Sequence, residues 1–88
     1  MEIKEVKIEW SDSYGVSTGW EDISDYSANE LIINSYGVIV YEDSNVIAVA
    51  HNYSKETEKT PKQANGIMVI PKACIKKITS YASCQELE

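Results

Sequence analysis

The amino-acid sequence predicts a small all-β protein, and three observations support this prediction. Residues 31–52 contain two runs rich in branched and aromatic side chains, separated by the polar step 42–45, as expected of a β-hairpin. Shorter β-type runs precede and follow this hairpin, and no stretch has the spacing of a substantial helix. The chain has 88 residues, 43% apolar and 25% charged, which is the composition of one ordinary globular domain.

The first predicted strand covers residues 3–10, where apolar and charged side chains alternate and Val6 and Ile8 share one face. Residues 11–20 contain several hydroxyl side chains, an aspartate and two glycines, which are typical of a loop. We expect Trp20 to attach this loop to the core.

Residues 21–29 carry two isolated apolar side chains three positions apart and allow at most one helical turn. The first strand of the hairpin is apolar on both faces, as in a central strand, and Gly37 predicts a bulge or a sharp bend in it. Residues 51–65 are polar, contain a proline and predict a long mobile loop. Short strands are expected at 66–70 and 74–79, joined by a single turn.

Five strands, one of them long and bent, with a turn before the last strand and little other helix favour a small SH3-like barrel over a sandwich. We expect this single domain to span residues 1–80, followed by a tail at 81–88. A chain of this size has a marginal core, which oligomerisation would support. Phenylalanine is absent, so tryptophan and tyrosine must supply the large side chains, and some of them should lie at the surface, where they suit binding.

The net charge of −6 is unevenly distributed. Residues 1–50 carry ten acids and two lysines, whereas residues 51–80 carry six lysines and two acids. Because the balance is acidic and arginine is absent, we expect no binding to duplex nucleic acid. The lysine-bearing part could still bind a small anionic ligand or an acidic partner. No apolar run reaches the roughly 18 residues of a membrane span, and the charged start is unlike a signal peptide, which predicts an intracellular protein.

Residue types that carry catalysis or bind metals are sparse, and we expect no enzyme, no metal and no cofactor. Cys74 and Cys84 lack the spacing of a zinc or redox pair and are expected to be free thiols, with Cys74 near the barrel wall. A nucleophilic role for Cys74 would need His51, the only histidine, beside it. The acids of residues 21–25 lack the spacing of a calcium loop.

Two polar segments carry the candidate ligand-binding groups. Residues 12–20 combine hydroxyls, an aromatic ring for stacking and backbone amides beside glycines, which could hold a purine or a phosphate without arginine. The alternative is a loop that only folds under its tryptophan. Residues 51–65 could close a tyrosine and lysines over an anion, or form a solvated loop. The candidate residues are Asp12, Ser13, Tyr14, Gly15, Ser17, Thr18, Trp20, His51, Tyr53, Lys55 and Lys59.

The runs VKIEW, DSYG and SYG, followed by GIMVIPK and CIKKI, together with Trp20, resemble a set of small uncharacterised phage and prophage proteins. The pattern covers most of residues 3–79. This resemblance implies an SH3-like fold and a phage-encoded accessory protein that is made in the cytoplasm of an infected bacterium. It implies no particular chemistry.

These features lead to two alternative expectations of function. The first is a non-enzymatic phage counter-defence protein that sequesters a small nucleotide-type immune signal, such as a cyclic oligonucleotide. It would do so as a homo-oligomer, between subunits, because a small chain has little room for a pocket of its own. The second is an inhibitor whose acidic half binds a basic surface of a host enzyme or defence protein. A virion or purely structural role also remains open.

Overall fold

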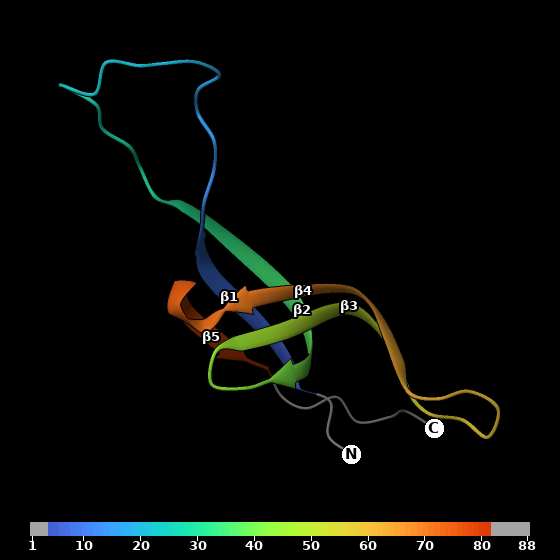
Figure 1. Ribbon diagram of the computed structural model, residues 1–88. Coiled ribbons are helices and arrows are strands. Elements are labelled where there is room, and N and C mark those ends of the chain that lie inside the picture. The colour runs from blue at the N-terminus through green and yellow to red at the C-terminus, as the bar shows by residue number, and fades with distance from the viewer. Residues whose placement is uncertain (1–3, 82–88) are drawn as a thin grey trace.

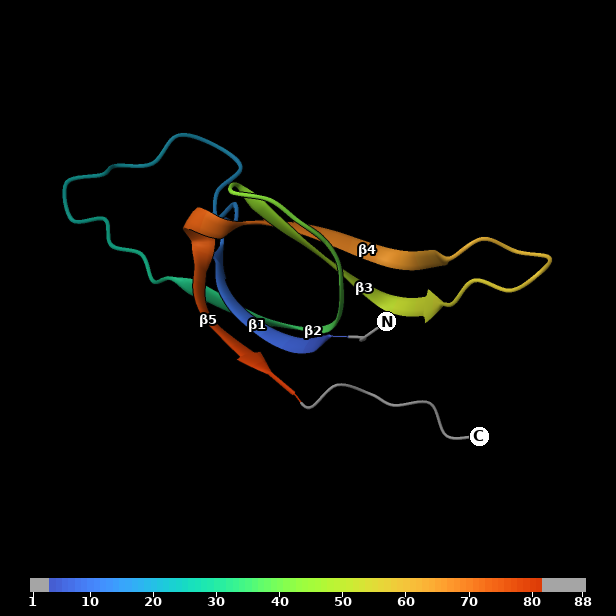
Figure 2. The same cartoon turned by 90° about the horizontal axis from the view of Figure 1, so that it is seen from below.

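The computed structural model describes residues 4–81, which form five antiparallel β-strands and one short 3-10 turn (Figure 1). In chain order, these elements are β1 (Glu5–Asp12), β2 (Leu31–Glu42), β3 (Val46–Ser54), β4 (Gln63–Pro71), η1 (Lys72–Cys74) and β5 (Ile75–Ser80). The strands form one sheet in the order β4-β3-β2-β1-β5, and Figure 2 shows this sheet curling round on itself. The predicted fold class, a small SH3-like β-barrel with little helix, is confirmed.

The barrel curls about β2, which pairs with β1 over its first part and with β3 over its last part. Val38 pairs with both neighbouring strands, and the β2–β3 register shifts at Val40. Gly37 lies beside this crossover, and a Cβ atom on it would stand 2.4 Å from the carbonyl oxygen of Ala50. The bend that the sequence predicts at Gly37 therefore depends on the absence of a side chain there.

The core lies inside the curled sheet and is small. Val6 and Ile8 of β1 are buried, which confirms the face predicted from the alternation of this strand. They pack against Ile47 and Val49 of β3 and Ile70 of β4. Each side chain of this kind contributes roughly 1.5–3 kcal/mol when it is fully buried. The partly buried residues packed against this cluster are Trp10, Ile39 and Ile75.

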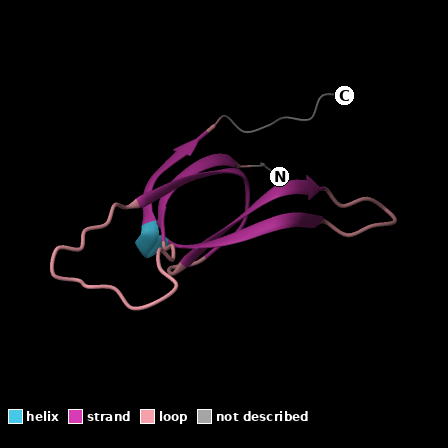
Figure 3. Ribbon diagram, turned by 90° about the horizontal axis from the view of Figure 1, so that it is seen from above, coloured by secondary structure: helices cyan, strands magenta, loops and turns pink. Residues whose placement is uncertain are grey.

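Two segments project from opposite ends of the barrel (Figures 1 and 3). Residues 13–30, here called the arm, connect β1 to β2 at one end. Residues 51–66, here called the ribbon, are the far part of the β3–β4 hairpin at the other end. They give the molecule extents of 61 × 26 × 24 Å and a radius of gyration of 17.7 Å, whereas a compact chain of this length has about 12 Å.

The expected contact between Trp20 and the core is wrong. Trp20 lies on the arm, which extends away from the barrel (Figure 1), and its side chain is 104% exposed. A tryptophan can cover the core only if its loop folds back over the sheet, and the loop here extends outward. The arm therefore presents its largest apolar side chain to water.

The expected long loop at 51–65 is also wrong. β3 continues to Ser54 and β4 begins at Gln63, so the loop is limited to 55–62. Backbone pairing forms this ribbon, and the side-chain Nδ2 of Asn52 donates a hydrogen bond across it to Asn65 Oδ1 at 2.6 Å. Because both faces of the ribbon lie largely in water, its sequence shows no apolar alternation that would indicate strands.

The turn predicted before the last strand is confirmed as η1, which carries Cys74 as a half-buried free thiol. Cys84 and residues 82–88 of the expected tail lie outside the described residues. Between residues 4 and 81, no helix has the length and apolar character needed to cross a membrane.

Candidate functional site

The arm contains no strand or helix over residues 13–30, and short hydrogen bonds shape it locally. The Tyr14 hydroxyl donates to the carbonyl oxygen of Asn29, which ties the two limbs of the arm together near its base. The Tyr26 amide donates to the Ile23 carbonyl oxygen at 3.3 Å, forming the single turn expected within 21–29. The arm is thus a shaped extension of the polypeptide chain and stands clear of the barrel (Figure 2).

The tip of the arm is apolar and exposed. Trp20 and Ile23 are 104% and 80% exposed, and Val16 and Tyr26 are also open to solvent. Gly15 and Gly19 have open space around them, so neither glycine is required by a close approach of other atoms. Large apolar side chains gathered on a projecting segment are typical of a contact surface.

The arm is also acidic, with four carboxylates and no lysine. The backbone amide and hydroxyl of Ser24 donate to Asp22 at 2.9 and 2.7 Å, and the amide contributes most to lowering the Asp22 pKa. At the base of the arm, Lys76 Nζ forms an ion pair with Glu30 Oε2 at 2.7 Å. Hydrogen bonds from Lys76 and, to a lesser extent, from the Ser11 side chain lower the pKa of the Glu30 carboxyl. These carboxylates remain ionised at neutral pH, so a phosphate beside the arm needs positive charge from elsewhere.

The second group of candidate residues lies on the ribbon. His51 and Tyr53 are on β3 itself, whereas Lys55 and Lys59 belong to the 55–62 loop. His51 is exposed and lies opposite Gly66, whose φ of +66° suits glycine; a Cβ atom at Gly66 would stand 3.2 Å from the His51 Cβ. His51 borders a hollow with Tyr36 and Tyr81, whereas Tyr53 lines another hollow with Lys62, so the imidazole and the phenol face different hollows.

The loop at the end of the ribbon is closed by two threonines. The Thr57 amide donates to the Thr60 carbonyl oxygen at 2.9 Å, and the Thr60 amide donates to Thr57 Oγ1 at 3.0 Å. Their hydroxyl oxygens lie 2.7 Å apart. This turn holds Lys59 between the two threonines, at the outer end of the ribbon.

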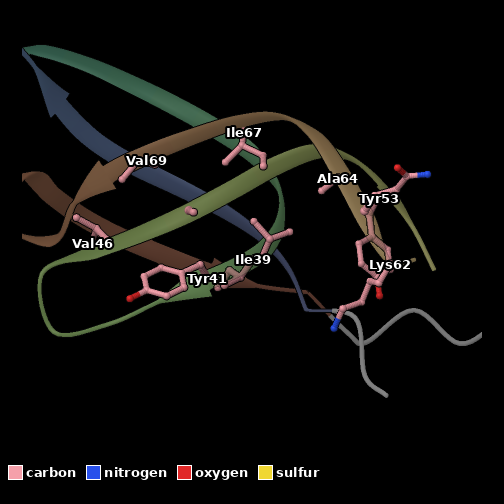
Figure 4. A pocket seen from close by; sticks show the side chains of 11 residues that line it. Ile39, Tyr41, Val46, Tyr53, Lys62, Ala64, Ile67 and Val69 are labelled. Carbon is pink, nitrogen blue, oxygen red and sulfur yellow. The ribbon is translucent and has the colours of Figure 1, made fainter. Parts of the chain in front are cut away.

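A groove of about 630 Å³ lies over β2, β3 and β4 and is called here the outer groove (Figure 4). The strand register places Tyr41, Ala48 and Val69 in one row across the three strands. The small side chain of Ala48 between two larger ones leaves the groove hollow. Figure 4 shows Tyr53 and Lys62 at the ribbon end of the groove. Further apolar residues that line it are Val40, Val46 and Ile67.

Sequence reasoning did not identify the outer groove. The signal is the second apolar face of the central hairpin, which by itself predicts a strand covered on both sides. In the structure one face lies inside the barrel and the other stays open, because no element of the described chain packs on it. Tyr41, Ile67 and Val69 are consequently 56%, 52% and 58% exposed.

The structure does not bring the two groups of sequence-predicted site residues together within one chain. Asp12 ends β1, and Ser13, Tyr14, Gly15, Ser17, Thr18 and Trp20 lie on the arm. His51, Tyr53, Lys55 and Lys59 lie on the ribbon, which leaves the barrel at the opposite end (Figures 1 and 3). Within residues 4–81, no three His, Cys, Asp or Glu side chains gather in a way that could hold a metal ion.

The fold and these surfaces define a small open β-barrel with an acidic aromatic arm, a lysine-bearing ribbon and an apolar groove. Comparisons with protein families, with curated proteins and with solved structures find no match.

Proposed function

We propose that this protein is a non-enzymatic binding protein that sequesters a small nucleotide-type ligand between subunits of a homo-oligomer. The observation that carries the proposal is the separation of complementary groups at the two ends of one chain. The arm carries aromatic rings and hydroxyls, whereas the ribbon carries three lysines against two glutamates. A nucleotide needs both, since its base stacks on an aromatic ring and its phosphate requires positive charge.

The arm supplies the groups that would bind the base. Trp20 offers a fully open ring face, and Tyr14 is also exposed near the base of the arm. Stacking of a nucleobase on such a ring is typically worth about 1–3 kcal/mol. Ser17 and Thr18 add hydroxyls beside Trp20. The nearby carboxylate of Asp22 would oppose a phosphate, so the arm alone does not complete the site.

The ribbon supplies the groups that would bind the phosphate. Lys55, Lys59 and Lys62 lie on or beside the 55–62 loop, and Tyr53 precedes them on β3. A second subunit that brings its arm to this ribbon would place a stacking ring beside ammonium groups. The ligand would then lie at the subunit boundary and would be held without chemical change.

The resemblance to small phage and prophage proteins supplies the biological setting of the proposal. A phage protein that holds a nucleotide-type immune signal, such as a cyclic oligonucleotide, would counter a bacterial defence from within the host cytoplasm. Sequestration requires only tight binding and an adequate concentration of the protein.

Calorimetry with a panel of cyclic and linear nucleotides tests this function. We expect heat with at least one of them, weaker binding for Trp20→Ala and for Lys59→Gln, and unchanged binding for Lys77→Gln. Lys77 lies on β5 and serves as a matched control for the loss of one lysine. The absence of heat with every nucleotide, or equal losses for both lysine variants, contradicts the proposal.

The acidic exposed arm favours one alternative function, which is inhibition of a host enzyme or defence protein with a basic surface. Trp20 and Ile23 would anchor the contact, and the neighbouring carboxylates would select a basic partner. Capture from a bacterial lysate at low and high salt, with Trp20→Ala as the control, tests this alternative. A specific protein retained only by the wild-type arm supports inhibition, and nucleotide heat without such a protein supports sequestration.

A further inference from the structure

We infer that the outer groove is the docking site for the arm of a second copy of this chain. The inference concerns the assembly of the protein and requires no bound ligand. It rests on the homo-oligomer of the proposed function and names the contact that would hold its subunits together, and the association of the ligand-free chain tests it separately from nucleotide binding.

The first argument is that the described residues 4–81 leave apolar side chains of both surfaces exposed. Trp20 and Ile23 on the arm are largely exposed. In the groove, Ile67 and Val69 are each more than half exposed. The arm points away from its own barrel in Figures 1 and 2, so its apolar tip does not cover its own groove. Burial of such side chains on association is favourable because it removes apolar surface from water.

The second argument is the complementary charge of the two surfaces. The arm has four carboxylates and no basic side chain. Lys62 is the charged residue in the groove lining, and the 55–62 loop to which it belongs carries three lysines against two glutamates, a net charge of +1. Asp43 lies in the turn beside Tyr41, and its carboxylate is occupied by the Tyr41 hydroxyl and by two backbone amides. An arm whose tip lies in the groove would bring its acids toward the lysine end.

The third argument is symmetry. Each copy has one arm and one groove, so two copies can exchange arms reciprocally about a two-fold axis, and no surface is then left open to further addition. Such an exchange would also place Trp20 of one copy near Tyr53 and Lys62 of the other. The small core of the barrel gives the exchange a physical advantage, because association would add buried apolar area.

The solution mass of the full chain, measured over a dilution series, tests the inference. We expect an oligomer that dissociates on dilution. Val69→Glu should weaken association on the order of 30-fold, because it places a carboxylate in the apolar lining of the groove, where the acidic arm would lie. Ile32→Glu is the matched control, since Ile32 is an exposed strand residue of β2 that does not line the groove. It should associate like the wild type.

A mixing experiment separates arm docking from other modes of association. The arm variant Trp20→Ser keeps its groove, and the groove variant Val69→Glu keeps its arm. Each variant alone should be mainly monomeric, whereas their mixture should regain a heterodimer with one intact contact. Circular dichroism confirms that each variant is folded; both altered side chains are exposed, so both should fold.

Three results would overturn the inference. The first is a wild-type chain that stays monomeric at every concentration. A groove that binds a different protein while the chain itself stays monomeric counts as this same result. The second is an oligomer that is equally sensitive, or equally insensitive, to Val69→Glu and Ile32→Glu. The third is a mixture of the arm and groove variants that remains monomeric.

Discussion

The indole Nε1 of Trp10 donates a hydrogen bond to the Ser35 hydroxyl oxygen at 3.0 Å, joining β1 to β2 beside the core. Ser35 lies in turn 3.8 Å from the sulfur of Met68 on β4, so one polar chain connects three strands of the barrel. The two tryptophans of the chain thus have opposite environments. Trp10 has a polar partner and packs on the core, whereas Trp20 stands in solvent.

Replacing Ser35 by alanine should destabilise the barrel by about 1 kcal/mol, because the half-buried indole N–H of Trp10 loses its acceptor. Ser35→Thr keeps the hydroxyl and should retain more of the stability. Urea denaturation followed by tryptophan fluorescence measures both effects. Equal stabilities of the alanine and threonine variants would show that the hydrogen bond makes no net contribution.

Removing a core side chain should cost much more than removing an exposed one on the same sheet. Ile8 is fully buried, and Ile8→Ala should lose about 2–5 kcal/mol of unfolding free energy. Ile32 is 39% exposed, and Ile32→Ala should lose distinctly less. Denaturant titration of the two variants gives the comparison. Losses of similar size would mean that Ile8 is not part of the buried core.

Gly37 should tolerate no side chain, because a Cβ atom there meets the Ala50 carbonyl oxygen at 2.4 Å. We expect Gly37→Ala to destabilise the chain by about 1–3 kcal/mol, since β3 or β2 must shift to admit the methyl group. Gly15→Ala is the matched control, because no atom lies within 4 Å of the added Cβ. Thermal unfolding of both variants checks the prediction, and a Gly37→Ala variant as stable as Gly15→Ala contradicts it.

The β2–β3 turn should weaken in acid because of Asp43. The amides of Asn45 and Val46 donate to its carboxylate at 2.7 and 2.9 Å, and with the Tyr41 hydroxyl they hold its pKa below the ordinary 3.8. A lowered pKa means that the stabilisation is present above 3.8 and is lost as the pH falls through the folded-state pKa.

Thermal unfolding of wild type and Asp43→Asn across this pH range measures that loss. The wild type should be the more stable at neutral pH, and the difference should shrink in acid, where the wild-type carboxyl is also neutral. The effect should be small because the group is exposed to solvent. A difference that stays constant from neutral to strongly acidic pH would contradict the role of the Asp43 charge.

Local patterns predicted most of the strands because each depends on neighbouring residues. Alternation around Val6 and Ile8 identifies β1 and its buried face, and the polar step before Val46 identifies the hairpin turn. Gly37 indicates the bend because a glycine inside a strand often marks a place where the strand bends or where another backbone segment comes close to it. The ribbon was missed because its polar strands are held by backbone pairing, which leaves no apolar period to read.

The sequence by itself determined an all-β barrel, the acidic and lysine-rich parts of the chain, and the residue types available for binding. Only the tertiary structure decided that Trp20 is exposed, that the arm and ribbon lie at opposite ends, and that Tyr41 and Val69 border an open groove. The physical reason is that strand formation follows from local side-chain alternation. Burial instead depends on which distant segments fold over a surface.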